Sequence, residues 1–179
     1  MLRRISLAIG YIFAQFFAKL DPIRYARSLG VKLGSNVRFY GIRPGMFSTE
    51  PWLITIGSNV YITNGCQFVT HDGGTLILRK DIPDLEITAP IVVGDDVYIG
   101  LNTLILPGAK IGNRVIIGAG SIVSGIIPDD SVAAGIPARV IKTLDQYKDS
   151  VIKRSLHLGH LSGKQKESAL KKHFGISEV

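Results

Sequence analysis

A hydrophobic period of six residues dominates the middle of this 179-residue chain. Between residues 93 and 128 the sequence divides into six successive units, VGDDVY, IGLNTL, ILPGAK, IGNRVI, IGAGSI and VSGIIP. This period fits neither the 3.6 residues of a helical turn nor the simple alternation of a strand. It predicts a chain that turns a corner every six residues, so that three units complete one triangular coil.

Two positions of each unit are predicted to form the core. The first position would point inward, and stacked coils would bury a continuous aliphatic column. These first positions are Val93, Ile99, Ile105, Ile111, Ile117 and Val123. The fifth positions are mostly small or β-branched: Val97, Thr103, Ala109, Val115, Ser121 and Ile127. Cys66 occupies the fifth position of an earlier unit, ITNGCQ, and is predicted to be a packing residue rather than a nucleophile.

The repeats and the segment after them resemble a known family. The stretches VGDDVYIGLNTLILPGAKIGNRVIIGAGSIV and IPDDSVAAGIPARVIK are similar to the hexapeptide-repeat acyltransferases, in the branch of galactoside, maltose and polysaccharide O-acetyltransferases. The resemblance extends over residues 33–144 and implies a left-handed parallel β-helix. The left hand comes from the resemblance alone, because general chirality rules favour right-handed crossovers.

The expected fold is mainly β and has three segments. Residues 1–30 form an N-terminal helical segment, residues 31–142 the left-handed β-helix acyltransferase domain, and residues 143–179 a basic helical C-terminal tail. The repeat signature disappears over residues 72–90, which predicts an excursion loop. The resemblance implies that this loop reaches toward a neighbouring subunit and covers the acceptor pocket.

The net charge of +7 is unevenly distributed along the chain. Residues 1–30 carry five basic and one acidic side chain, residues 139–179 nine and four, and the segment between them seven and nine. A nucleic-acid-binding domain more often carries a basic stripe with aromatic residues on its folded face. The central segment has none, so no nucleic-acid partner is expected. The basic ends fit an anionic membrane surface or an anionic cofactor.

Residues 1–20 begin with Arg3 and Arg4 and continue with an apolar run, Ile5–Ala18. The run is shorter than the roughly 20 residues that span a bilayer, and no small-residue cleavage site follows it. Two interpretations stay open. The segment packs on the coils or on a neighbouring subunit, or it makes peripheral contact with a membrane surface. The expected location is cytoplasmic, with the inner face of the cell membrane as the peripheral alternative.

His71 is the predicted general base. It lies where the repeat breaks, and functional side chains concentrate on loops beside a rigid scaffold. Acyl transfer to a hydroxyl group needs a base with a pKa near neutrality. The resemblance implies the same role, because the family's catalytic histidine ends the coil before the excursion, where FVTHDGG stands. The neighbouring Asp72 is a candidate to orient His71, or else a turn residue before Gly73.

Acetyl-CoA is the expected co-substrate. Its pantetheine arm would pair with main-chain groups along a coil edge where small residues allow close approach. The resemblance adds a main-chain oxyanion donor and two cations for the phosphate groups. The expected contacts are Gly100, Leu101, Gly118, Ala119, Ser121, Ser124, Arg139 and Lys142. Gly125 stands where relatives carry Lys, and Tyr98 where they carry Trp.

Trp52 and Arg79 are the candidates on the acceptor side, although a lone Trp is more often a packing residue. No metal is expected, because the chain has neither an HExxH motif nor paired cysteines. The resemblance implies a homotrimer with active sites between subunits and a saccharide acceptor.

The leading functional hypothesis is acetyl transfer from acetyl-CoA to a sugar hydroxyl group in surface-polysaccharide or lipopolysaccharide synthesis. One alternative is N-acetylation of an amino-sugar nucleotide or another small acceptor. The other is a non-enzymatic β-helix scaffold.

Overall fold

The computed structural model describes residues 2–176 of the chain, with side chains from Gly10 onward. Two helices come first, α1 (Leu2–Leu20) and α2 (Pro22–Ser28). The strands are β1 (Lys32–Leu33), β2 (Arg38–Phe39), β3 (Ile54–Ile56), β4 (Tyr61–Ile62), β5 (Gln67–Phe68), β6 (Ile91–Val93), β7 (Tyr98–Ile99), β8 (Leu104–Ile105), β9 (Lys110–Ile111), β10 (Ile116–Ile117), β11 (Ile122–Val123), β12 (Ile126–Ile127), β13 (Ser131–Gly135) and β14 (Ala138–Thr143). Two 3₁₀ helices, η1 (Pro51–Leu53) and η2 (Gly73–Ile77), interrupt them, and α3 (Leu144–Arg154) and α4 (Gly163–Phe174) follow.

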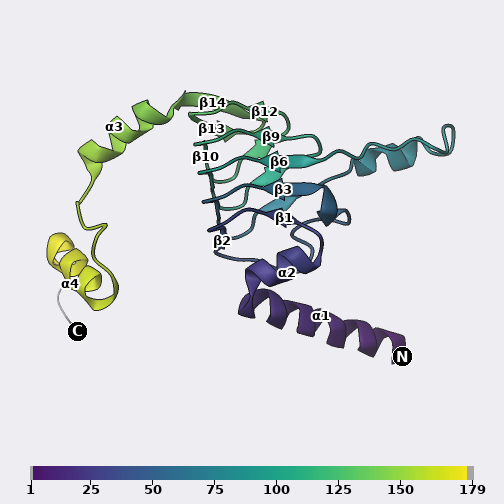
Figure 1. Cartoon of the computed structure of the whole chain (residues 1–179), viewed down its shortest axis with the longest axis horizontal. Coiled ribbons are helices and arrows are strands. Elements are labelled where there is room, and N and C mark those ends of the chain that lie inside the picture. Colours follow the sequence, from purple (N-terminus) through teal and green to yellow (C-terminus); the bar gives the residue numbers. More distant parts are fainter. Residues whose placement is uncertain (1, 177–179) are drawn as a thin grey trace. The chain divides into compact units, whose positions relative to one another are not determined.

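The strands form three sheets that the chain visits in turn (Figure 1). Sheet A has the order β1-β3-β6-β9-β12, sheet B the order β2-β4-β7-β10-β13-β14, and sheet C the order β5-β8-β11. From β3 to β13 the succession is A, B, C without exception, so each three strands make one coil. Neighbouring strands are parallel, apart from the antiparallel β13–β14 hairpin. The mainly parallel β architecture predicted from the sequence is therefore confirmed.

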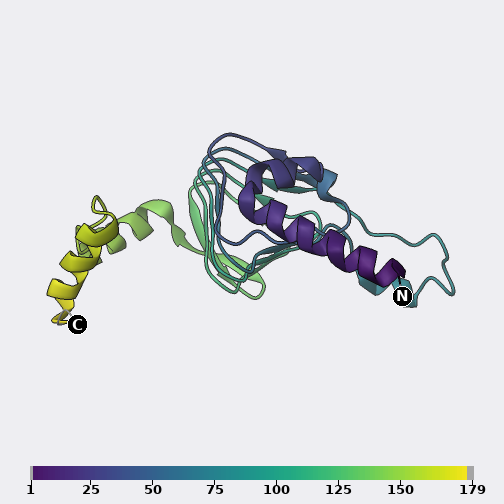
Figure 2. The same ribbon diagram turned by 90° about the horizontal axis from the view of Figure 1, so that it is seen from below.

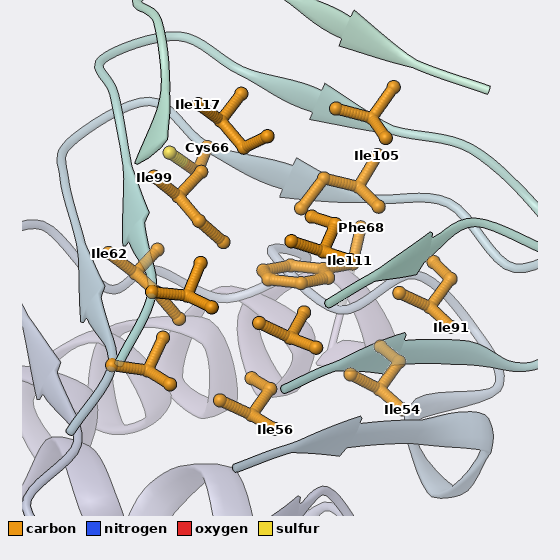
Figure 3. Close-up of a cluster of buried hydrophobic side chains, with 14 of the residues drawn as sticks. Ile54, Ile56, Ile62, Cys66, Phe68, Ile91, Ile99, Ile105, Ile111 and Ile117 are labelled. Atoms are coloured by element: carbon orange, nitrogen blue, oxygen red, sulfur yellow. The ribbon is translucent and has the colours of Figure 1, made fainter. Parts of the chain in front are cut away.

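The six predicted inward side chains are buried, with at most 2% of the surface of each exposed. Strand pairing stacks them, since Ile99 lies opposite Ile117 and Ile105 opposite Val123. Figure 3 shows how isoleucines from successive coils converge with Phe68 in one column. Removing a buried isoleucine side chain beyond Cβ costs about 2–5 kcal/mol, so the column is the main source of stability in this unit.

Cys66 is buried in the same core, as predicted from its place in the repeat. Its Sγ donates to the main-chain oxygen of Gly100 at 3.2 Å. Burial raises the pKa of the Cys66 thiol above its usual value. A thiol that stays protonated and enclosed acts as a packing residue.

The sixth repeat unit is two residues shorter than the sequence pattern suggests. Ile111 pairs with Val93, 18 residues earlier, whereas Ile127 pairs with Ile111, only 16 residues earlier. Ile127 is therefore not the fifth position of a full unit, as predicted, but the inward residue of the next strand. The chain makes a tighter corner directly after β11, at Ser124 and Gly125.

Glycines at the coil corners allow the stacked turns to approach closely. A Cβ on Gly94 would lie 2.7 Å from the main-chain oxygen of Gly112, a distance that no ordinary side chain tolerates. Beside these glycines, side chains bind the next corner: Asp95 Oδ1 accepts from the Ser58 N–H at 2.6 Å, and Asn113 Oδ1 from the Asp95 N–H at 2.8 Å. These side-chain hydrogen bonds link the corners of successive coils, in addition to the main-chain hydrogen bonds between the strands.

Helix α2 lies against the first coil, next to β1, and α1 packs beside α2 (Figures 1 and 2). Ala18, Tyr25 and Ala26 are buried in the core, and the Phe17 ring meets the Tyr25 ring edge to face at 5.8 Å. Asp21 begins α2 by accepting from the Arg24 N–H at 2.9 Å. The end of α1 therefore packs on the coils, which was one of the two interpretations of residues 1–20.

The described chain divides into two compact units at Leu144. The second unit contains α3 and α4, and neither helix buries a residue. Gly175, in the left-handed conformation with φ 65°, ends α4. Among the described helices of either unit, none has the length and apolar character needed to cross a membrane.

Candidate active site

His71 lies at the neck of the excursion loop. The Asp72 N–H donates to the Ile87 oxygen and the Ala89 N–H to the Thr70 oxygen, each at 2.9 Å. These two bonds flank an antiparallel bridge between His71 and Thr88. The loop thus leaves and returns through a short two-stranded neck that fixes the main chain on both sides of His71.

A carboxylate that the sequence interpretation missed holds the His71 ring. Glu50 Oε2 lies 2.8 Å from His71 Nδ1. Thr70 Oγ1 donates to the same oxygen and Thr49 Oγ1 to Oε1, each at 2.6 Å. The hydrogen bonds from Thr49, Thr70 and His71 lower the pKa of Glu50 to about 2, so the carboxylate is charged at neutral pH.

The ionised Glu50 determines which His71 nitrogen is available as a base. A carboxylate can only accept, so Nδ1 carries the hydrogen in the bond to Glu50. In the neutral ring this leaves the lone pair on Nε2, which can take a proton from a bound hydroxyl group. The His71 side chain is 36% exposed, so a ligand can reach it, and the Glu50 side chain is 24% exposed.

Two adjoining cavities meet at His71. The larger, of about 480 Å³, is mainly apolar and is lined by Val69, His71, Asp72, Gly73, Ile87, Leu104, Leu106, Pro107 and Ser124. The smaller, of about 240 Å³, is polar and is lined by Thr49, Glu50, His71, Asp72, Gly73, Thr75, Leu76, Arg79 and Glu86. His71, Asp72 and Gly73 belong to both walls, so the imidazole stands between an apolar and a charged compartment.

Asp72 lines both cavities, but its carboxylate supports the loop. Its Oδ1 accepts from the Gly74 N–H at 2.8 Å and so caps η2. This is the turn role that the sequence allowed for Asp72. The partner of the imidazole is Glu50, which lies 21 residues before His71.

Of the two acceptor-side candidates, only Arg79 lines a cavity with His71. Arg79 Nε donates to the Leu85 oxygen at 2.9 Å, and its Nη2 pairs with Glu86. The guanidinium group is therefore held on the wall of the smaller cavity. Trp52 lies on η1, is 58% exposed and lines neither cavity.

The predicted coenzyme contacts occupy two different corners of the coil. Ser124 follows a strand of sheet C, as His71 does, and lies in the larger cavity. Five others precede the strands of sheet C: Gly100 and Leu101 follow β7 of sheet B, while Gly118, Ala119 and Ser121 follow β10 of sheet B. Within one chain, the structure therefore brings Ser124 to His71 but not the other five.

Ser121 is committed to the fold. Its side chain is fully buried, and its hydroxyl group donates to the Gly118 oxygen at 2.6 Å and accepts from the Gly135 N–H at 3.2 Å. The hydroxyl group holds β13 to the preceding corner, so the predicted contact of Ser121 with coenzyme A stays a prediction about its main chain. Similarly, the Gly100 N–H donates to the Ile117 oxygen at 2.9 Å, so this amide is part of the sheet ladder.

Arg139 and Lys142 lie on β14, the last strand of sheet B. They pair in register with Ala134 and Val132 of β13, and Arg139 is exposed. Across the part of the chain that the structure describes, no three His, Cys, Asp or Glu side chains gather closely enough to hold a metal ion.

Comparison with known proteins defines the class to which these coils belong. The family described as "Bacterial transferase hexapeptide (six repeats)" matches residues 90–125. The chain is 40% identical over 148 residues to "Protein CapG" of Staphylococcus aureus, covering 83% of this chain and 86% of that protein. It therefore belongs to the hexapeptide-repeat transferase family.

Two further relatives are acetyltransferases by name, and with them the family membership makes this chain an acyltransferase. The chain is 34% identical over 142 residues to the "Galactoside O-acetyltransferase" of Escherichia coli strain K12, covering 75% of this chain and 68% of that protein. A crystal structure of the hexapeptide-repeat acetyltransferase VCA0836 from Vibrio cholerae O1 biovar eltor, complexed with acetyl coenzyme A, matches with a TM-score of 0.50 and 32% identity. That match covers 64% of this chain and 61% of the V. cholerae protein.

Proposed function

We propose that this protein transfers an acetyl group from acetyl-CoA to a hydroxyl group of a saccharide, with His71 as the general base. The observation that carries the proposal is the 2.8 Å contact between His71 Nδ1 and the ionised Glu50, at a junction of two cavities. In the neutral ring this contact leaves the lone pair on Nε2, and His71 lines both cavities, which supports a base that can reach a bound acceptor. The relatives named above support acetyl-CoA as the acyl donor, since one was solved as a complex with acetyl coenzyme A and another is a galactoside O-acetyltransferase.

The chemistry follows from the charge state of the pair. Nε2 of His71 takes the proton of the acceptor hydroxyl group while the oxygen attacks the thioester carbonyl carbon. The carbon–sulfur bond of the resulting tetrahedral intermediate then breaks, and the imidazolium returns its proton to the leaving coenzyme A thiolate. Glu50 holds the ring and stabilises the imidazolium that exists between these two steps.

The separation of the predicted contacts over two coil corners supports a trimer with shared sites. His71 and Ser124 lie after strands of sheet C, and the Gly118–Ala119 edge lies after a strand of sheet B. In a homotrimer of left-handed β-helices, one subunit would supply the His71 corner and its neighbour the Gly118 corner. The Leu101 N–H of that neighbour is then the proposed oxyanion donor, and its Arg139 and Lys142 are the proposed phosphate contacts.

The smaller cavity is the proposed acceptor site. Its carboxylates and its Arg79 guanidinium offer the acceptors and donors that sugar hydroxyl groups require. The larger, apolar cavity suits the acetyl group and the end of the pantetheine arm. We place the reaction in surface-polysaccharide or lipopolysaccharide synthesis; a relative 37% identical over 98 residues is named "Putative lipopolysaccharide biosynthesis O-acetyl transferase WbbJ".

The test measures coenzyme A release from acetyl-CoA over a panel of sugars, sugar nucleotides and lipid-linked saccharides. His71→Ala should lower turnover by about 10²–10⁴-fold, which is the usual contribution of a positioned base, and leave coenzyme A binding unchanged. His160→Ala is the matched control, because His160 is an exposed histidine of the second unit and should retain full turnover.

Three other results would each contradict one part of the proposed function. Full turnover by the His71→Ala protein would exclude His71 as the base. Coenzyme A binding without turnover on any saccharide would exclude the acceptor class and favour an amine acceptor. A native protein that binds no coenzyme A would exclude acetyl-CoA as donor and leave a scaffold.

A further inference from the structure

From Gly10 onward, where its side chains are described, helix α1 has two apolar sides, and one of them packs on the fold. Ala18 is fully buried against the first coil, while Ala14 and Phe17 pack against the same core. The Phe17 ring also meets the Tyr25 ring of α2 at 5.8 Å. This side accounts for the attachment of α1 to the coils.

The other side leaves large apolar side chains in water. Ile12, Phe13, Phe16 and Leu20 are between 64% and 72% exposed. At 100° per residue these four positions fall on one side of a helix, which we call the α1 apolar face. Single exposed apolar residues are normal, but a contiguous patch of this kind marks a surface that binds something.

The charge of α1 indicates what covers this face. Its sequence, LRRISLAIGYIFAQFFAKL, contains Arg3, Arg4 and Lys19 and no Asp or Glu. Basic side chains at both ends of an apolar helix with aromatic residues are typical of helices that lie in the headgroup region of an anionic bilayer. At 1.5 Å per residue the 19-residue helix α1 is about 28 Å long. No described helix is long and apolar enough to cross a membrane, so the orientation to consider for α1 is in the plane of the bilayer surface.

We propose that α1 binds the surface of an anionic lipid bilayer, lying in its plane with the α1 apolar face among the acyl chains. The net positive charge of the helix sequence would then be attracted to the lipid phosphate groups. The competing occupant is the α1 apolar face of a second copy. That contact would bring identical cations together with no acidic side chain in either helix to pair with them, so the lipid surface is the better match. The inference does not depend on the proposed acetyl transfer.

The experiment is flotation of the full-length protein with lipid vesicles at low salt. Vesicles of phosphatidylcholine with roughly one quarter phosphatidylglycerol should bind the protein at least about tenfold more strongly than phosphatidylcholine alone. The double variant Phe13→Glu/Phe16→Glu should weaken binding to the anionic vesicles at least about tenfold, because it removes two aromatic side chains from the acyl region. Both residues are exposed, so the fold should be unaffected.

Phe174→Glu/Ile176→Glu is the matched control. Phe174 at the end of α4 and Ile176 just after it are 62% and 58% exposed, so this double variant adds the same two negative charges outside α1 and should bind like the native protein. Equal binding of the native protein to neutral and anionic vesicles, or undiminished binding of the double variant, would overturn the proposal. So would native protein that stays off vesicles but loses oligomeric mass in light scattering when Phe13 and Phe16 are replaced, since the face would then bind a second copy.

Discussion

Glu50 binds His71 across two successive coils, with its Oε2 2.8 Å from the ring Nδ1. Glu50 precedes η1, in the irregular part of the first coil, whereas His71 ends the regular part of the next one. The pair therefore depends on the stacking of the coils, and Thr49 and Thr70 complete it by donating to the two carboxylate oxygens.

The first prediction concerns the role of Glu50 in turnover. Glu50→Gln keeps the shape of the side chain but removes its charge, so it no longer selects the Nδ1–H form of His71 or stabilises the imidazolium. We expect the turnover number to fall by about 10- to 10³-fold with little change in KM for acetyl-CoA, by analogy with the carboxylate of a catalytic triad. Steady-state coenzyme A release as a function of pH measures this, because the rate profile should change shape as well as height.

Glu167→Gln supplies the control for this prediction. Glu167 is an acidic residue of α4 that pairs with Lys171 on the surface, so its replacement should leave the rate and the pH profile unchanged. If Glu50→Gln retained the native profile, Glu50 would have no part in orienting His71.

The second prediction is a pH dependence of stability. The pKa of Glu50 is lowered from 4.5 to about 2 in the folded protein, so the folded state holds its proton less tightly than the unfolded state. The stabilisation is fully present above pH 4.5 and is lost as the pH falls toward 2. Glu50 is partly exposed to solvent, so we expect a contribution on the order of 1 kcal/mol.

Urea unfolding of the native and Glu50→Gln proteins measures this contribution. The native protein should be the more stable at pH 7, and the difference in unfolding free energy should shrink between pH 4.5 and pH 2. A difference that stayed constant over this range would mean that the hydrogen bonds of the side chain, rather than its charge, stabilise the fold.

The coil architecture could be predicted because it is local and periodic. The inward column from Val93 to Val123 follows directly from one aliphatic residue every six positions, and all its members are buried. The burial of Cys66 follows from the same period. Each of these positions depends only on the spacing of the pattern, which is visible in the sequence.

The features that were missed occur where the period fails. Glu50 lies in the stretch between β2 and β3, where no period places it beside His71. The short sixth unit was missed because Ile127 is apolar, so it fits both the fifth position of one unit and the inward position of the next. The excursion loop itself was predicted, but the way its two ends meet was not. Phe68 and Ile105 pair across 37 residues, so only long-range packing determines that meeting.

The third prediction separates two serines that the sequence placed in the same coenzyme site. Ser121 is buried and binds the Gly118 oxygen and the Gly135 N–H, whereas Ser124 is exposed in the larger cavity. Ser121→Ala should lower the unfolding free energy by about 1–3 kcal/mol, because it removes both hydrogen bonds of a buried hydroxyl group. Ser124→Ala should change stability by less than about 0.5 kcal/mol, as expected for an exposed position.

The variant with the smaller effect on stability, Ser124→Ala, should have the larger effect on the KM for acetyl-CoA. In the proposed site, Ser124 borders the space for the acyl donor, so Ser124→Ala should raise the KM for acetyl-CoA several-fold. Ser121→Ala should leave this KM close to the native value at temperatures where the fold is intact. Thermal unfolding and coenzyme A release on the same preparations provide both measurements. If Ser121→Ala were as stable as the native protein but weakened acetyl-CoA binding, the Ser121 hydroxyl group would have to leave the Gly118 corner and bind the coenzyme directly.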